Sequence, residues 1–323
     1  MAKKKRRRTK NFFINNFRIP KNFKQHAIVE HFDIYKKKKE YVNASLLKSF
    51  LEDPASAEYG YNESKEETPS MKIGTAVHAK ILEPKLFRKE YIKQTVIEKV
   101  VADKSWALKA NADHKKAEEL KFLKKAKNRV VLTESEWDKV HLMVKNAKKL
   151  PLVKDLFTPG TYTAERDYFF ELEYSQDEKG KNKYKGKIRV DYEHNKLPIM
   201  LDVKTSKSVS LQGFRKEYGT YDYPLQMAYY FDNIKKFRDI KEIFILVLKN
   251  TAPYTAAIYR IPMSEIEYGR TLYEAALNRL EITDMLGYAP SAEISAGYDY
   301  DTNEIMDQGV MELNTYFKKD FII

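Results

Sequence analysis

The sequence predicts a mixed α/β (α+β) fold with a central sheet flanked by helices. Residues 162–174 and 185–205 alternate between apolar and polar side chains, as half-buried antiparallel strands do. A helical segment at 223–236 is followed by the continuous apolar run 243–248, which is typical of a strand covered on both faces. Strand, helix and strand in this order imply a right-handed crossover onto a mixed sheet.

Helices are expected on both sides of these strands in the sequence. Residues 42–54 form a short helix with Asn43 or Ser45 as its cap and Pro54 as its terminator. The next helix, residues 71–84, contains Gly74 one turn before His78, which is tolerable if another element approaches closely there. The remaining elements, in chain order, are a polar loop at 58–70, a charged surface helix at 103–128, a helix from the capping box of Thr133 and Glu136 to about Pro151, an edge strand at 255–261 and a long helix at 264–286.

Composition restricts the class of protein. The 323 residues carry a net charge of +13 and include no cysteine, which excludes a disulfide framework, an iron–sulfur cluster and a thiol nucleophile. No apolar run approaches membrane-spanning length, and the N-terminus lacks the apolar core of a signal peptide, so we expect a soluble, cytoplasmic protein with no membrane partner.

The positive charge is concentrated near the N-terminus. Residues 1–10 hold seven Lys and Arg and no acid, and Lys36 to Lys39 form a second basic run. We interpret residues 1–40 as a flexible arm that attracts phosphate, although a solubilising tail or a nuclear-import signal would look similar. Residues 41–290 are expected to form the main domain, and residues 291–323 a tail without assigned structure.

The hairpin at 185–205 presents charged residues on one face. With its turn centred on Asn195 and Lys196, Asp191 would lie diagonal to Asp202, with Lys204 on the same face. Two carboxylates about 4 Å apart repel by on the order of 4 kcal/mol at an effective dielectric of 20, and a divalent cation would offset this. All-oxygen ligation favours Mg²⁺ or Mn²⁺. Alternatively, the two aspartates are solvated strand-end residues paired with Arg189 and Lys204.

Six segments, in this order, resemble one enzyme family: VNASLLKSFLEDP, GTAVHAKILEP, AERDY, KGKIRVD, LDVKT and YPLQMAYY. They resemble the PD-(D/E)XK nuclease fold and, within it, the RecE-like (exonuclease VIII) group of phage recombination exonucleases, which are related to the nuclease domain of RecB. The resemblance covers roughly residues 41–250.

The resemblance implies a role for each matching residue. Metal ligands would be His78, Asp191, Asp202 and the backbone carbonyl of Val203, although a lone helical histidine is more often structural. Lys204 matches the catalytic lysine, and the acid before it in the motif is aspartate rather than glutamate. The other implied site residues are Gln226 and Tyr230, which position substrate and contact DNA, Glu165, a recurrent strand glutamate, and Lys187 and Arg189 as further DNA contacts.

The activity implied by the resemblance is Mg²⁺- or Mn²⁺-dependent resection of double-stranded DNA ends, 5′ to 3′, in a phage or prophage protein of a bacterial host. Its implied partners are a RecT-like single-strand annealing protein and further copies of the chain. Two alternatives remain open from the sequence. One is another PD-(D/E)XK nuclease that acts on single strands, and the other is a non-catalytic nucleic-acid-binding protein that uses the 23 tyrosines for stacking.

Overall fold

A six-stranded sheet forms the centre of the computed structural model, which describes residues 13–20, 22–63, 67–98, 100, 102, 104–174, 182–289, 298–299 and 304–305. The strand order is β1-β4-β5-β6-β7-β8. All neighbours are antiparallel except β6 and β7, which are parallel. The sheet strands are β1 (His26–Val29), β4 (Tyr162–Tyr174), β5 (Asn182–His194), β6 (Ile199–Ser206), β7 (Glu242–Lys249) and β8 (Ala256–Arg260).

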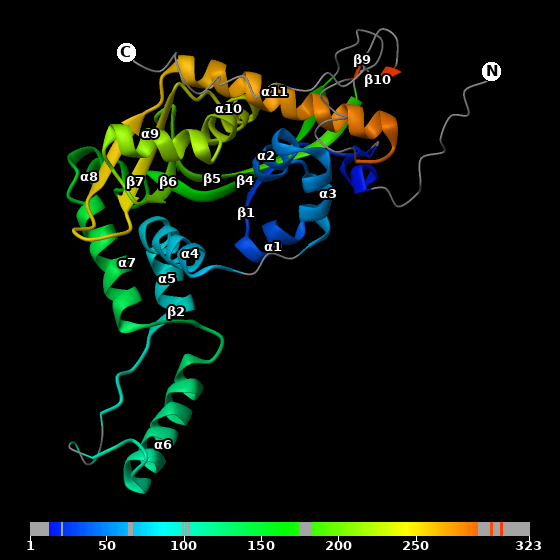
Figure 1. Ribbon diagram of the computed structural model, residues 1–323. Helices are drawn as coiled ribbons and strands as arrows, with labels where there is room; N and C mark the ends of the chain where they lie inside the picture. Colours follow the sequence, from blue (N-terminus) through cyan, green and yellow to red (C-terminus); the bar gives the residue numbers. More distant parts are fainter. Residues whose placement is uncertain are drawn as a thin grey trace.

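Helices cover both faces of the sheet, as Figure 1 shows. One face packs against α2 (Ala44–Glu52), α9 (Leu211–Thr220), α10 (Tyr223–Ile234), α11 (Met263–Leu286) and the 3-10 helix η1 (Phe13–Phe17), through a core that includes Phe17, Phe50 and Tyr229. The other face packs against α4 (Pro69–Leu82), α5 (Pro84–Glu90), α7 (Glu134–Ala147) and α8 (Pro151–Leu156), through a core that includes Val77, Met143 and Leu246. The expected mixed sheet flanked by helices is confirmed.

The parallel pair β6 and β7 fixes the position of α10. Helices α9 and α10 connect these strands, and the apolar side of α10, including Leu225, Ala228 and Tyr229, is fully buried. On its outer side, α10 packs so closely on α11 that a Cβ at Gly269 would lie 2.1 Å from the carbonyl oxygen of Pro224. This contact admits only glycine, and it holds α10 with its polar side along the edge of β6.

The N-terminal segment differs from the expectation of a flexible arm through residue 40. Phe13, Ile14 and Phe17 of η1 are buried in the core, and β1 pairs with β4 from His26–Phe169 to Val29–Arg166. Helix α1 (Phe32–Lys37) follows, and the ammonium of Lys38, from the second basic run, pairs with Glu30. Residues 13–40 therefore include parts of the folded body, whereas the basic run 1–10 lies outside the described residues.

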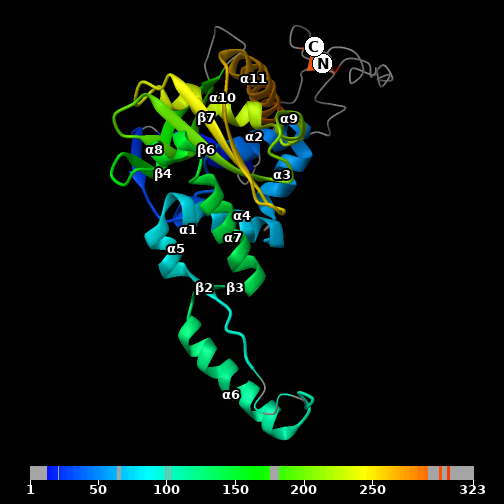
Figure 2. The ribbon, with the colours of Figure 1, turned by 90° about the vertical axis from the view of Figure 1, so that its left-hand side faces the viewer.

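One helix projects from the body. Helix α6 (Lys109–Ala126) extends away from the sheet on two connecting segments, as Figures 1 and 2 show from directions 90° apart. Its base is a parallel ribbon of β2 (Tyr91–Lys93) and β3 (Val130–Leu132) beside α5 and α7. The expected charged surface helix at 103–128 is present and is more detached than the sequence indicated.

Other elements agree with the sequence or extend it. Asn43 caps α2, and Thr133 and Glu136 form the expected capping box of α7. Pro54 does end α2 but also opens α3 (Pro54–Asn62), where a polar loop was expected to begin at residue 58. Two short strands, β9 (Tyr298–Asp299) and β10 (Glu304–Ile305), pair within the tail left unassigned. None of the helices in the described part of the chain has the length and hydrophobicity needed to cross a lipid bilayer.

Candidate active site

The site lies where β5 and β6 separate. The two strands pair only at Tyr192–Leu201 and Glu193–Met200, and beyond these pairs the backbone N–H of Val203 donates instead to Oδ2 of Asp191 at 2.7 Å. A carboxylate thus takes the place of the next rung of the ladder. The separation opens a gap between the strands that is lined by Asp191 on one side and by β6 on the other.

The register of this hairpin differs from the expected one. The observed pairs place its centre between Lys196 and Leu197, so Asp191 is level with Asp202 rather than diagonal to it. The cause is the turn, in which Nδ1 of His194 accepts from the N–H groups of both Lys196 and Leu197, at 3.1 and 2.9 Å. A side chain that closes a turn in this way lengthens the loop beyond the two-residue turn assumed from the sequence.

Glu165 enters the site through an unusual backbone conformation. Its φ of +51° lies in the left-handed region, which non-glycine residues seldom adopt and which is often found at functional sites. The β4–β5 ladder pairs Ala164 with Tyr192 and Arg166 with Val190, and it omits the intervening pair, Glu165 with Asp191. Both carboxylates therefore leave the regular sheet at the same level.

Helix α4 brings a third group to the same place. Nδ1 of His78 lies 3.6 Å from Oδ2 of Asp191 and 4.0 Å from Oε1 of Glu165. One ligand atom from each of the three residues lies within 4.8 Å of the others. Gly74, one turn earlier, faces Thr205 of β6, but a Cβ there would meet its hydroxyl at an ordinary 3.7 Å. The close approach expected at Gly74 is thus present without demanding glycine.

The charges of this cluster are unbalanced. Burial raises the pKa of Glu165 well above its usual range, and the negative charge of Asp191 raises it further, while the nearby Arg189 lowers it. Two half-buried carboxylates at this separation favour protonation of one of them unless a cation compensates. The charge balance of these two carboxylates therefore favours a cation beside them.

Asp202 lies beside this cluster in contacts of its own. Its Oδ2 is 2.6 Å from the ammonium of Lys204, and its Oδ1 accepts from the side-chain amide of Gln226 at 3.1 Å. Asp202 is buried, and Lys204 is the ion-pair partner of its Oδ2. Burial raises the pKa of Asp202 and Asp191 adds to the shift, whereas Lys204 opposes it. Because a carboxylate offers about four acceptor sites, Asp202 can bind a cation in addition to Lys204 and Gln226.

Lys204 is held in the charged form. Burial alone would lower its pKa, but the carboxylates of Asp202 and Asp191 outweigh burial and raise it. Its ammonium also lies 4.8 Å from the ring centre of Tyr223, at the start of α10. The residue is therefore a fixed positive charge next to the acidic cluster.

The other expected members of the site are placed as follows. Because the N–H and C=O of one strand residue point to the same side, the carbonyl of Val203 faces the gap together with its N–H. Tyr230, one turn after Gln226 on α10, has its pKa raised by burial and also by the charges of Asp202, Asp191 and Glu165. The charges of the acidic cluster therefore act on the phenol of Tyr230.

Sequence reasoning missed Lys48 on α2. Its ammonium donates to the carbonyl of Tyr221 at 2.6 Å and to Oε1 of Gln226 at 3.5 Å, and it lies 5.0 Å from the ring centre of Tyr223. Burial lowers the pKa of Lys48 to about 8, and the charge of Lys204 contributes. Lys48 belongs to the VNASLLKSFLEDP segment, but a single lysine on a short helix gave no signal that it would reach α10.

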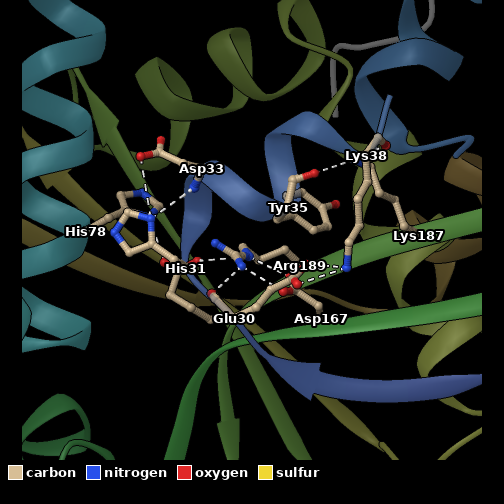
Figure 3. A network of polar contacts seen from close by, with 10 residues as sticks. Glu30, His31, Asp33, Tyr35, Lys38, His78, Asp167, Lys187 and Arg189 are labelled. Carbon is tan, nitrogen blue, oxygen red and sulfur yellow. Dashed lines mark hydrogen bonds and ion pairs between the residues drawn. The ribbon is translucent and has the colours of Figure 1, made fainter. Parts of the chain in front are cut away.

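Two expected DNA contacts occupy different positions. Arg189 binds Asp167 through two bonds, at 2.6 and 2.7 Å, and Lys187 donates to the carbonyls of Tyr35 and Lys38 at 2.9 and 2.7 Å. Figure 3 shows this network between the sheet and the N-terminal segment. Arg189 and Lys187 are only 6% and 2% exposed, so their assignment as DNA contacts does not fit the structure. Their charges are used to hold residues 30–38 on the sheet.

The network also reaches the acidic cluster. Nε of Arg189 lies 3.8 Å from Oε2 of Glu165. Burial raises the pKa of Asp167, which Arg189 opposes, and Asp167 in turn raises the pKa of Arg189 in spite of its burial. Arg189 therefore connects the N-terminal segment, through the carbonyl of Glu30, to the side chain of Glu165.

This donor set fits a divalent cation. Carboxylates of Glu165, Asp191 and Asp202, one imidazole nitrogen of His78 and the Val203 carbonyl are hard or borderline ligands of the kind that Mg²⁺ or Mn²⁺ accepts. Three of them already converge from three separate elements. The family resemblance implied Asp202 as a metal ligand and Glu165 only as a recurrent strand glutamate. In the structure Glu165, and not Asp202, is a member of the group of three.

Comparison with known proteins agrees with this fold. The family model described as "PDDEXK-like domain of unknown function (DUF3799)" matches residues 43–291. The chain belongs to this family. Its expected PD-(D/E)XK core is confirmed, whereas the narrower resemblance to the RecE-like group is not tested by this match.

One solved structure shows the same fold at low sequence identity. A candidate exonuclease from Eubacterium rectale aligns with a TM-score of 0.51 at 14% identity, over 88% of this chain and 96% of that one. The structure of SSO0001 aligns at 16% identity over 74% of this chain and 85% of that one, but its TM-score of 0.28 is too low to support an argument. No curated protein matches the sequence.

Proposed function

We propose that the protein is a divalent-metal-dependent DNA exonuclease. The observation that carries this proposal is the convergence of His78, Glu165 and Asp191 within 4.8 Å, beside the buried pair of Asp202 and Lys204. A protein that only bound nucleic acid would have no use for three carboxylates at a phosphate-binding surface, because they repel phosphate. The same acids are useful if a cation joins them to the phosphate.

Each residue has a role that follows from its position. The acids and His78 would hold Mg²⁺ or Mn²⁺, which supplies a polarised phosphate and a more acidic bound water. Lys204, as a fixed ammonium, is placed to donate to the attacking water or to a phosphate oxygen. Gln226 orients Asp202 through its amide, and burial and the charges of the same acids keep the phenol of Tyr230 neutral.

Narrower parts of the proposal come from the resemblance to RecE-like exonucleases. They are action on double-stranded DNA ends with 5′ to 3′ polarity, assembly of several copies, cooperation with a RecT-like annealing protein, and a cytoplasmic role in a phage or prophage. The basic run at 1–10 fits a phosphate-binding segment in such a protein. The description of the Eubacterium rectale structure as a candidate exonuclease supports the same class of activity.

Digestion of linear duplex DNA labelled at one 5′ or 3′ end, with a covalently closed circle as control, tests the proposal. We expect Mg²⁺-dependent release of nucleotides from the linear substrate and none from the circle, with loss of activity in EDTA. Cleavage of the circle would indicate an endonuclease, and digestion of single strands alone would indicate the alternative single-strand nuclease. Absence of cleavage under all metals would support a non-catalytic binding protein.

A further inference from the structure

Helix α6 carries more positive charge than its surroundings require. Residues 104–129 contain nine Lys and Arg and three acids. Of the acids, Glu119 lies 3.8 Å from Lys115 and Glu118 lies 2.6 Å from Lys121, so two lysines are partnered. Asp113 forms no ion pair with a described residue. Most of the lysine charge on this helix is therefore not balanced by carboxylates.

Three of the four lysines of α6 without an ion-pair partner among the described residues share one face, whereas the fourth, Lys125, lies about 160° away from Lys109 around the helix. Lys109, Lys116 and Lys124 are exposed and lack a carboxylate within ion-pair distance in the described part of the chain. At 100° per residue these three lie within about 80° of one another around the helix, at intervals of about 10 and 12 Å along it. The partnered residues Lys115 and Lys121 lie outside this arc. The arc also contains Asp113, so the three lysines, which we call the α6 stripe, form an edge of net positive charge along most of the helix.

Packing does not explain why α6 stands away from the body. Only Asn111 and Ala126 are buried in its 18 residues, and the helix projects beyond the rest of the molecule in both views (Figures 1 and 2). Its base, in contrast, is firmly attached, because Tyr91 stacks on Phe87 and Lys93 pairs with Glu134 at 2.8 Å. A helix held out on a rigid base is positioned for contact with something outside the chain.

The base of α6 is linked directly to the candidate active site. Strand β2 follows α5, which follows α4, the helix that carries His78. On the other side, α7 rises from the base toward the body, and its Lys145 and Lys148 line a hollow of about 560 Å³ together with Lys80 of α4. Asp138 is the one acid among the residues that line this hollow, so the hollow also carries net positive charge.

We propose that α6 is a DNA-binding arm in which the α6 stripe contacts the phosphate backbone of the duplex whose end occupies the active site. This rests on the proposed nuclease function. The helix is about 27 Å long, a distance over which duplex DNA carries roughly 16 phosphates, so all three lysines can find one. Such contacts are independent of sequence, which suits an enzyme that moves along DNA.

Self-association is the competing use of this face, since Leu120 and Leu123 are exposed close to the α6 stripe. Two copies of the helix would bring two sets of unbalanced lysines together, and this repulsion opposes such a contact. DNA offers the opposite charge, and the two leucines can pack on sugar edges without cost. The charge balance therefore favours DNA over a second copy.

The test compares two triple variants that remove the same charge. Lys109→Gln, Lys116→Gln and Lys124→Gln together remove the α6 stripe. Lys115→Gln, Lys121→Gln and Lys241→Gln together remove three lysines that are each paired with an acid. Both are made in the full-length chain, also carrying Asp202→Asn so that DNA remains intact, and binding to a 30-base-pair duplex is measured from 0.05 to 1 M salt.

We expect loss of the α6 stripe to flatten the slope of log affinity against log salt by roughly 2.7, at about 0.9 per contact, with a loss on the order of 100-fold at 0.1 M salt. The control should change the slope by less than 1. Equal salt slopes for the two variants would overturn the proposal. A variant that changes the sedimentation coefficient but not DNA affinity would also overturn it, and would assign the face to self-association. Nuclease assays with the chain that keeps Asp202 separate the DNA-binding arm from the proposed nuclease function. If this chain cleaves DNA but loss of the α6 stripe leaves the salt slope unchanged, only the arm is refuted. If the chain neither binds nor cleaves DNA, both hypotheses are refuted.

Discussion

Glu165→Gln should stabilise the metal-free protein while weakening its response to metal. Ligand atoms of Glu165 and Asp191 lie no more than 4.8 Å apart, so their ionised forms repel by about 3.5 kcal/mol at an effective dielectric of 20. Arg189, 3.8 Å from Glu165, offsets part of this repulsion but keeps its two bonds to Asp167 in the variant. We therefore expect a net gain of about 1–2 kcal/mol in the free energy of unfolding.

The pH dependence of this gain follows from the raised pKa of Glu165. The folded chain binds the proton of Glu165 more tightly than the unfolded chain, so the free energy of unfolding of the wild type rises as the pH falls through the folded pKa. The rise ends near the unfolded value of about 4.3. Glu165→Gln removes this dependence on pH. The difference in the free energy of unfolding between the variant and the wild type is therefore largest above the folded pKa of Glu165 and disappears in mild acid.

Thermal unfolding in EDTA and in increasing Mg²⁺ or Mn²⁺ measures both effects. In EDTA at pH 8 the variant should unfold at a temperature a few degrees higher, at roughly 2–4 °C per kcal/mol. Metal at 100 times its dissociation constant should stabilise the wild type by about 2.7 kcal/mol and the variant by much less. Glu83→Gln is the control for the metal response, because burial also raises the pKa of Glu83 and its charge acts on Glu165, but it lies outside the group of three ligands and should keep the full metal shift. A variant that is less stable in EDTA, or that keeps the full metal shift, would refute the reasoning.

Three further predictions concern residues around this cluster. Arg189→Met should lower the free energy of unfolding by about 3–5 kcal/mol, because it leaves Asp167 buried and unpaired. Denaturant titration measures this loss. The salt slope of DNA binding by the folded variant should stay unchanged. Lys48→Met should reduce kcat more than KM, since Lys48 contacts Gln226 rather than a ligand, and Lys48→Arg should restore part of the activity; an unchanged kcat would make Lys48 a purely structural residue. Gln226→Ala with Tyr230→Phe should lower kcat/KM at least tenfold without changing metal affinity, and full activity of that double variant would remove α10 from the site.

The elements that make the site were largely predictable from the sequence. The alternation in the hairpin, the continuous apolar strand β7 and the capped helices α2 and α7 are local patterns, and each appears in the structure. The candidate residues His78, Asp191, Asp202 and Lys204 came from the same patterns together with the family resemblance. All four now lie around one gap.

The interactions that the sequence did not reveal depend on tertiary contacts. Glu165 joins the ligand cluster because its backbone adopts a positive φ, a choice that no local pattern of alternating residues indicates. The sequence indicated that Arg189 and Lys187 are exposed charges on one face of a strand. In the structure they bind carbonyls of the N-terminal segment, which covers them. The segment itself was interpreted as an arm because of its lysines, although its phenylalanines Phe13 and Phe17 are what bury it.

Cleavage and binding by Asp202→Asn, measured side by side on an end-labelled linear duplex, test the proposed nuclease centre most directly. The substitution keeps the size of the side chain and the bond to Gln226, but it removes the charge that pairs with Lys204 and that faces the cluster of His78, Glu165 and Asp191. We predict that Mg²⁺-dependent cleavage is lost while DNA affinity in EDTA remains within a few-fold of the wild type. Normal Mg²⁺-dependent cleavage by this variant would contradict the assignment of the site.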